Sequence, residues 1–193
     1  GYILTDYRNI KRFNSVFPEM INDGFSFGIN YRNPVKSWFG SFFYTYSILQ
    51  NNILYSISIN QFGASELQTF RIDNERKNHN LNFKLSKYIS EIKSTFTLNS
   101  SFSKSTFFQL VNNNLNEISN NNSVFELKIN SEVTDKFEVE LKSNVVFSKN
   151  KIQETENKLI ANQLHSFNLN FYPKEKHYLA LKSEFLINNS FTT

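Results

Sequence analysis

The sequence predicts an all-β protein, an antiparallel transmembrane β-barrel, and three observations lead to this fold class. Apolar and polar residues alternate with a period of two in segment after segment, which is the spacing of strands whose two faces meet different surroundings. Turn-sized connections alternate with long polar ones, as they do in outer-membrane barrels. No run of about 18 apolar residues offers a transmembrane helix, whereas a barrel strand shows only every second residue to lipid.

Nine strands are predicted from this alternation. Their apolar faces are, in chain order, Phe25, Phe27, Ile29 and Tyr31; Trp38, Phe42, Tyr44, Tyr46 and Ile48; Ile53, Tyr55, Ile57 and Ile59; Leu81, Phe83 and Leu85; Ile92, Phe96, Leu98 and Phe102; Phe125, Leu127 and Ile129; Phe137, Val139, Leu141, Val145 and Phe147; Phe167, Leu169 and Phe171; and Leu179, Leu181, Phe185 and Ile187. None of these positions is charged, as lipid requires, because a midplane charge costs roughly 2–4 kcal/mol on the outside of a barrel. The opposite faces are mostly polar, except for Phe39 and Phe43 on the second strand.

Two hairpins allow the strand register to be predicted. Asn51 and Asn52 suit a two-residue type I′ turn, because Asn tolerates positive φ, and Gln50 then pairs with Ile53. Around Thr134, a register that joins Ser131 to Phe137 satisfies burial and charge together. Its pairs are Ile129 with Val139, Leu127 with Leu141, Lys128 with Glu140 and Glu126 with Lys142. Opposite charges across a ladder are favourable.

The predicted connections differ in length. Short ones lie near 50–52, 86–91, 132–136 and 172–177, and long ones near 62–79, 104–122 and 149–163. Outer-membrane barrels have short periplasmic turns and long extracellular loops. The connection at Asn33–Lys36 is short but falls on the long-loop side, which makes it an exception.

Composition limits the possible functions. The 193 residues include no Cys, which excludes disulfides, thiolate metal sites and cysteine nucleophiles. The net charge of +4 is spread out, without the Lys/Arg block of a nucleic-acid patch. Because Gly1 stands first, we expect a processed chain or one cut from a larger protein. Because nine is an odd number of strands, we expect a section of a larger barrel, or one further strand within residues 1–24. Residues 1–24 are predicted to be an extracellular loop or the end of a preceding strand, and residues 25–193 a barrel section.

Each candidate site residue has a structural interpretation as well as a functional one. Glu138 and Glu140 share a face, where two carboxylates can do acid–base work or hold a cation, or form ion pairs in a barrel lumen. The histidines His79, His165 and His177 lack metal-ligand spacing. The Asn-rich stretch 112–122 fits a sugar-binding loop or a solvated loop. No catalytic, cofactor-binding or metal-binding residue is predicted, no cofactor is expected, and the ligand-binding residues are unknown.

Seven aromatic residues are candidates for the girdles that flank the apolar band of a barrel. They are Trp38, Tyr31, Tyr44, Tyr46, Tyr55, Tyr88 and Tyr178. The alternative interpretation is ordinary β-propensity.

The stretch Phe25-Ser-Phe-Gly-Ile-Asn-Tyr-Arg-Asn-Pro-Val-Lys-Ser-Trp-Phe, with the aromatic strand to Tyr46, resembles the later barrel strands of TonB-dependent outer-membrane receptors. It is most similar to those of Bacteroidota, including the SusC-like and carboxypeptidase-regulatory-like branches, and the resemblance covers roughly residues 25–190. It implies a barrel of about 22 strands with a plug, nutrient uptake energised through TonB, and a SusD-like surface lipoprotein as partner in one branch. The plug, the TonB box and the terminal aromatic residue of such receptors have no counterpart in this sequence.

Three functions remain open from the sequence. The first is a section of the wall of a transporter in the bacterial outer membrane, in contact with lipid and, through parts outside this chain, with the TonB system. The second is a structural or interaction barrel subunit of an outer-membrane complex without transport activity. The third is a soluble antiparallel β-sandwich or barrel, such as an adhesion domain. None of these is an enzyme, and the substrate, the partner proteins and the true termini cannot be deduced.

Overall fold

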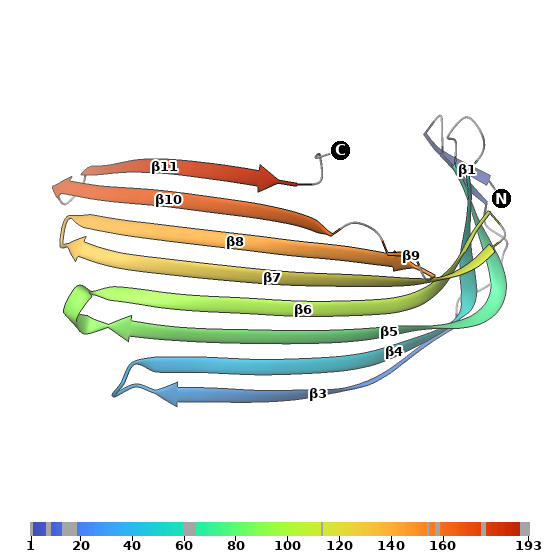
Figure 1. Ribbon diagram of the computed structural model, residues 1–193, viewed down its shortest axis with the longest axis horizontal. Helices are drawn as coiled ribbons and strands as arrows, with labels where there is room; N and C mark the ends of the chain where they lie inside the picture. The colour runs from blue at the N-terminus through green and yellow to red at the C-terminus, as the bar shows by residue number, and fades with distance from the viewer. Residues whose placement is uncertain are drawn as a thin grey trace.

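The computed structural model shows a single curved sheet that bends sharply near one end (Figure 1). It describes residues 2–6, 9–12, 19–59, 65–112, 114–153, 155–156, 159–174 and 177–189. The elements are β1 (Tyr2–Asp6), β2 (Asn9–Arg12), β3 (Met20–Asn33), β4 (Trp38–Ile59), β5 (Ser65–Ile89), the 3₁₀ turn η1 (Ser90–Ile92), β6 (Ser94–Val111), β7 (Asn114–Thr134), β8 (Phe137–Ile152), β9 (Thr155–Glu156), β10 (Ile160–Lys174) and β11 (His177–Asn188). The predicted all-β class is therefore confirmed.

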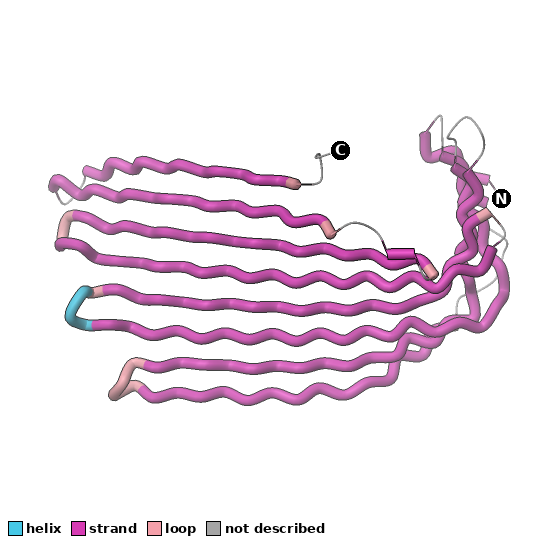
Figure 2. Tube along the Cα trace, viewed as in Figure 1, coloured by secondary structure: helices cyan, strands magenta, loops and turns pink. Residues whose placement is uncertain are grey.

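Eight long strands form an antiparallel meander in the order β3, β4, β5, β6, β7, β8, β10, β11. The sheet is open: within the part of the chain that the structure describes, β3 pairs only with β4 and β11 only with β10. Figure 2 shows the long strands lying side by side in one layer, with β3 and β11 as the outer edges. The nine predicted strands correspond to eight long strands in the described part of the chain, because β4 contains two of them.

The extra predicted strand arose at Asn51 and Asn52, which do not form a turn. β4 runs through both residues, and a register shift against β5 between Asn51 and Ile53 bends it there. The two amides stabilise this bend: the Asn52 Oδ1 atom accepts the backbone N–H of Glu19 at 2.9 Å, and the Asn51 Oδ1 atom accepts that of Ile53 at 2.9 Å. The predicted pairing of Gln50 with Ile53 was therefore wrong, and Gln50 lies opposite Glu75 instead.

With β4 as one strand, the short connections at 34–37, 90–93 and 135–136 all lie at the same end of the sheet (Figure 1). The turn at Asn33–Lys36 is thus no exception. Neighbouring turns are joined by hydrogen bonds: the Ser37 carbonyl accepts the N–H of Tyr88 at 3.2 Å, and the Lys93 carbonyl accepts that of Glu132 at 3.0 Å. These bonds hold adjacent hairpins level with each other.

At the other end of the sheet, most of the predicted long loops are strand. β5 takes up residues 65–89, and β6 and β7 are joined by residues 112–113 alone, with Val111 opposite Asn114. Asn112 has φ 48°, a left-handed conformation that Asn adopts readily in two-residue hairpins. A turn conformation of the kind expected at 51–52 is thus found at Asn112. The Asn-rich stretch is mainly the start of β7 rather than a loop.

Beyond the bend, β4 and β5 continue as a flap, which we define as Ile53–Ile59 and Ser65–Arg71. In Figure 1 it rises at the right, across the ends of the long strands. Ser56 and Ile57 run parallel to Leu110 and Val111 of β6, and β2 runs parallel to β5. Ile53 and Leu54 are the only buried apolar side chains among the residues whose exposure is described. The protein's small core is therefore at the flap, not under the long strands.

Candidate functional site: the two faces of the sheet

Strand register places the predicted apolar positions of the long strands on one face. One row of directly paired residues contains Ile29, Phe42, Phe83, Ser100, Phe125, Val145, Gln163 and Ile187. Many of these side chains are exposed, with Phe27 at 53%, Leu141 at 44% and Leu181 at 60% relative accessibility. Contiguous exposure of large apolar side chains marks an interaction surface rather than a normal solvated one. We call this face the apolar band.

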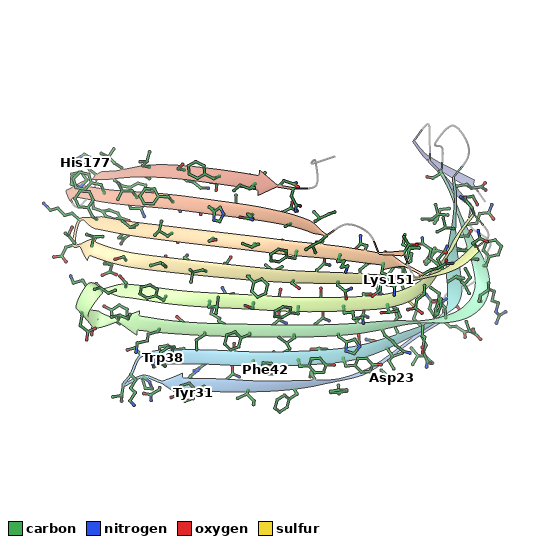
Figure 3. All side chains as sticks on the ribbon, in the orientation of Figure 1. Asp23, Tyr31, Trp38, Phe42, Lys151 and His177 are labelled. Carbon is green, nitrogen blue, oxygen red and sulfur yellow. The ribbon has the colours of Figure 1, made fainter. Side chains whose placement is uncertain are left out.

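Charged residues bound the apolar band on both sides. Toward the flap, the row after Phe27 and Tyr44 contains His79, Lys104 and Lys149. Toward the short turns, the Lys87 ammonium lies 4.6 Å from the centre of the Trp38 ring. Figure 3 labels markers of both limits, with Asp23 and Lys151 near the bend and Trp38 near the turns. On this face of the sheet, charged side chains of the described residues therefore occur only near the ends of the apolar band.

The candidate girdle residues divide between the two faces. Alternation and pairing put Tyr31, Trp38, Tyr44 and Tyr46 on the side of the apolar band. Tyr88 and Tyr178 lie on the opposite face, and Tyr55 is in the flap. On the flap side of the band, the Tyr44 hydroxyl is 2.9 Å from the His79 Nδ1 atom, and the Tyr46 ring is 4.7 Å from that imidazole.

The opposite face carries ion pairs between β7 and β8. Lys128 reaches Glu140 at 2.5 Å and Lys142 reaches Glu126 at 2.9 Å. Both pairs were predicted, but the register is not the predicted one. A shift between Glu132 and Thr134 puts Lys128 directly opposite Lys142, so the ion pairs run diagonally.

The ion pairs extend sideways through amides and a phenol. The Asn99 amide donates to Glu126 at 2.8 Å, and the Asn168 amide donates to Glu140 at 3.0 Å. The Tyr172 hydroxyl donates to Glu138 at 3.1 Å. The two carboxylates Glu138 and Glu140 therefore have separate partners on β10, and they are part of a structural polar network that we call the polar face.

The histidines do not come together. His79 contacts Tyr44, and the His165 Nε2 atom lies 3.4 Å from the Gln163 side chain. His177 begins β11 at the far end of the sheet (Figure 3). No group of His, Cys, Asp and Glu within the described ranges could hold a metal ion.

A polar hollow of about 420 Å³ lies at the bend, and its lining includes Glu19, Asp73 and Glu75. Glu75 is engaged by Lys77 at 2.6 Å, and this hydrogen bond raises the pKa of the Lys77 ammonium above its usual value. The hollow is outside the apolar band and lies beside the bend, since Asn51 and Asn52 also line it.

Two further hollows lie side by side on the polar face. They lie at Phe39 and Phe43, the two residues that broke the polar pattern of this face in the sequence. One, of about 260 Å³, includes Arg32, Phe39 and Lys84 in its lining. The other, of about 370 Å³, includes Phe43 and Lys84. Arg32 and Lys84 carried no signal in the sequence, because only the pairing of β3, β4 and β5 brings them together.

Comparison with known proteins identifies no relative. No protein-family model, no curated protein and no solved structure matches this chain significantly. Among the helical residues that the structure describes, none belongs to a segment long and apolar enough to cross a membrane. The likeness to TonB-dependent receptors remains a hypothesis from sequence.

Proposed function

We propose that this sheet is a section of the wall of a β-barrel in the bacterial outer membrane. The observation that carries the proposal is the apolar band: one face of the eight long strands carries apolar side chains, which are exposed on β3, β6, β7, β8 and β11 and half-buried on β4, β5 and β10. A soluble protein would bury such a face against a second layer. In the described part of the chain, the element contacts are between sheet neighbours and at the η1 turn, not between layers.

The height of the apolar band fits a membrane. On β8 it extends from Phe137 to Phe147, and eleven extended residues measure roughly 36 Å. A barrel strand tilted by roughly 45° would then cross about 25 Å, which is the height of the lipid-facing band of outer-membrane barrels. The polar continuations of the strands beyond this band would stand outside the hydrocarbon.

The outer edges support the idea that more strands complete the wall. β3 and β11 each have one row of backbone groups without a sheet partner among the described residues. Long exposed edges promote aggregation, and barrel closure removes them. In lipid, unpaired backbone groups cost several kcal/mol each. Further strands would therefore pair with β3 and β11.

We assign this wall to a TonB-dependent transporter for nutrient uptake. The polar face would surround the transport path or the plug, and its ion pairs and amides suit a wet interior. The TonB system and a surface lipoprotein would act through parts outside this chain. The second candidate, a structural subunit of an outer-membrane complex, is favoured by the flap, which offers strand and side-chain surface beyond the apolar band for a protein partner.

A pair of lysine substitutions tests the membrane assignment. Leu141→Lys puts a charge on the apolar band and should lose outer-membrane assembly, measured as heat-modifiable protein in the membrane fraction. Asn144→Lys is the matched control on β8, because its side chain faces Glu126 across the ladder and should assemble normally. Equal loss in both variants, or normal assembly of both, would refute lipid exposure of the band. Water solubility without detergent would favour the β-sandwich.

The intact mass of the native polypeptide from the outer membrane separates the two membrane functions. A mass several times the 22.7 kDa of this chain would support a large plugged receptor. A mass near 22.7 kDa in a heat-modifiable protein would refute the transporter and leave the structural subunit.

A further inference from the structure

We propose that the two adjoining hollows on the polar face of β3, β4 and β5 bind a small organic anion with an aromatic body. The carboxylate, or another anionic group, would lie between Arg32 and Lys84, and the apolar body would rest on Phe39 or Phe43. We call this the anion site. It requires only that the polar face be accessible, so it does not depend on the transporter assignment.

Strand pairing brings the cations and the rings together. Arg32 is directly opposite Phe39, which is opposite Ser86. One row away, Ser41 is opposite Lys84. All five residues line the hollow of about 260 Å³. The side chains therefore converge from three neighbouring strands with a fixed register.

The charges of Arg32 and Lys84 differ from those of three lysines on this face. Lys128, Lys142 and Lys182 each form an ion pair with a glutamate. Arg32 and Lys84 have no acidic partner among the residues that the structure describes. Two neighbouring cations without a counter-charge attract an anion. Arg in particular can hold a carboxylate by two parallel hydrogen bonds.

The two phenyl rings are exposed where the surface is otherwise polar. Phe39 and Phe43 have 43% and 47% relative accessibility. Phe43 is opposite Gly28, and its ring carbons lie 2.6 and 3.0 Å from the place where a Gly28 Cβ would stand. The missing side chain of Gly28 therefore leaves the ring room to lie across β3. The exposed rings can stack with a planar apolar ligand.

The size and lining of the hollows fit a small molecule. They measure about 260 and 370 Å³ and share Ser41 and Lys84, so Lys84 stands between the two rings. The larger hollow also contains Glu126, but this carboxylate is already paired with Lys142. Asn30 and Asn82 supply amides at the two margins, which can fix the orientation of a polar group.

Binding of phenylacetate to the full chain in detergent micelles, followed by isothermal titration calorimetry, tests the anion site. Phenylacetamide has the same ring without the charge, and acetate has the charge without the ring. We expect phenylacetate to bind more tightly than either. Lys84→Gln and Arg32→Gln should each weaken phenylacetate binding by about three- to fivefold, in line with single exposed charge pairs, and should leave phenylacetamide binding unchanged.

Four further variants make the result specific. Lys84→Arg keeps the charge and should retain binding, which excludes misfolding at this position. At least one of Phe39→Ala and Phe43→Ala should weaken phenylacetate and phenylacetamide alike, and no effect from either would overturn the proposal. Lys182→Gln removes a charge from the same face on β11 and should have no effect. The proposal is overturned if phenylacetate shows no saturable binding in the millimolar range, if phenylacetamide binds equally well, or if Lys182→Gln weakens binding as much as Lys84→Gln.

The outcome is distinguishable from that of the proposed function. If phenylacetate does not bind, the membrane assignment is untouched: Asn144→Lys should still assemble in the outer membrane and Leu141→Lys should still fail to assemble. Conversely, a protein that is soluble without detergent would refute the membrane assignment while phenylacetate could still bind at Arg32 and Lys84.

Discussion

The Lys128 ammonium lies 2.5 Å from a carboxylate oxygen of Glu140, although the residue directly opposite Lys128 is Lys142. The diagonal contact neutralises one of two lysines that face each other across β7 and β8. Like charges directly opposite one another destabilise a ladder. Glu140 therefore relieves a repulsion that the register creates, in addition to forming its own ion pair.

Glu140→Gln should consequently destabilise the protein more than Lys128→Gln. The first leaves Lys128 and Lys142 opposed, and the second removes the repulsion together with the pair. A double-mutant cycle of unfolding free energies should give a coupling of about 0.3–1 kcal/mol, because both side chains are partly exposed. Urea titration in micelles at low and high salt measures it. A coupling that does not fall at high salt would contradict the electrostatic origin.

Gly24→Ala should destabilise the β3–β4 hairpin, whereas Gly40→Ala should be tolerated. A Cβ at Gly24 would stand 2.4 Å from the Tyr46 backbone oxygen. The nearest atom to a Cβ at Gly40 is the Leu85 Cδ1 at 3.5 Å, an ordinary contact. We expect a loss of about 1–3 kcal/mol for Gly24→Ala, measured by urea unfolding. Equal unfolding free energies of the two variants would contradict the described pairing.

Trp38 is the single tryptophan of the chain, and its fluorescence reports the limit of the apolar band. In bilayers we expect quenching by lipids brominated close to the headgroups and weak quenching by lipids brominated near the chain ends, because Trp favours the interface. Lys87→Ala should alter the emission by removing the cation 4.6 Å from the ring. Strong quenching by an aqueous quencher alone would place Trp38 in water.

Leu54→Ala should loosen the flap without opening the long strands. Leu54 is 2% exposed, and its neighbour Tyr55 is 47% exposed. Truncation of a buried Leu costs about 2–5 kcal/mol, so hydrogen exchange should accelerate at Ile53–Ile59 and Ser65–Arg71. Tyr55→Ala is the control, with a smaller expected change. Faster exchange throughout β6–β8 would mean that the flap is not a separate unit of stability.

Sequence periodicity predicts this fold where the two sides of a strand differ in polarity. From Phe137 to Phe147 the alternation is clear, and the structure confirms both the strand and its apolar face. Beyond the apolar band both sides are polar, so residues 71–79 and 114–122 lose the alternation while they remain in β5 and β7. Loops were therefore predicted where strands continue.

Local turn chemistry was less informative than pairing. Asn51-Asn52 and residues 112–113 are the same dipeptide, yet β4 runs through the first, whereas Asn112 in the second is a turn residue. The Asn52 side-chain oxygen accepts a hydrogen bond from the backbone N–H of Glu19, a contact that only the tertiary structure provides. At the Thr134 hairpin the shift near Glu132 changes the partners by two residues and keeps every side chain on its face. Face and ion-pair partners were predictable, whereas exact register was not. Phe39 and Phe43 marked an apolar exception on the polar face, but only the pairing of β3, β4 and β5 shows that Arg32 and Lys84 lie beside them.

The central claim is that the apolar band faces lipid, and site-directed spin labelling along β8 tests it most directly. The chain contains no Cys, so single cysteines from Phe137 to Phe147 can be labelled in the otherwise unchanged protein and reconstituted in bilayers. The account predicts alternation with a period of two: odd-numbered positions accessible to oxygen, and even-numbered positions accessible to a water-soluble nickel chelate. High nickel accessibility at odd and even positions alike would contradict it and would place both faces of the sheet in water.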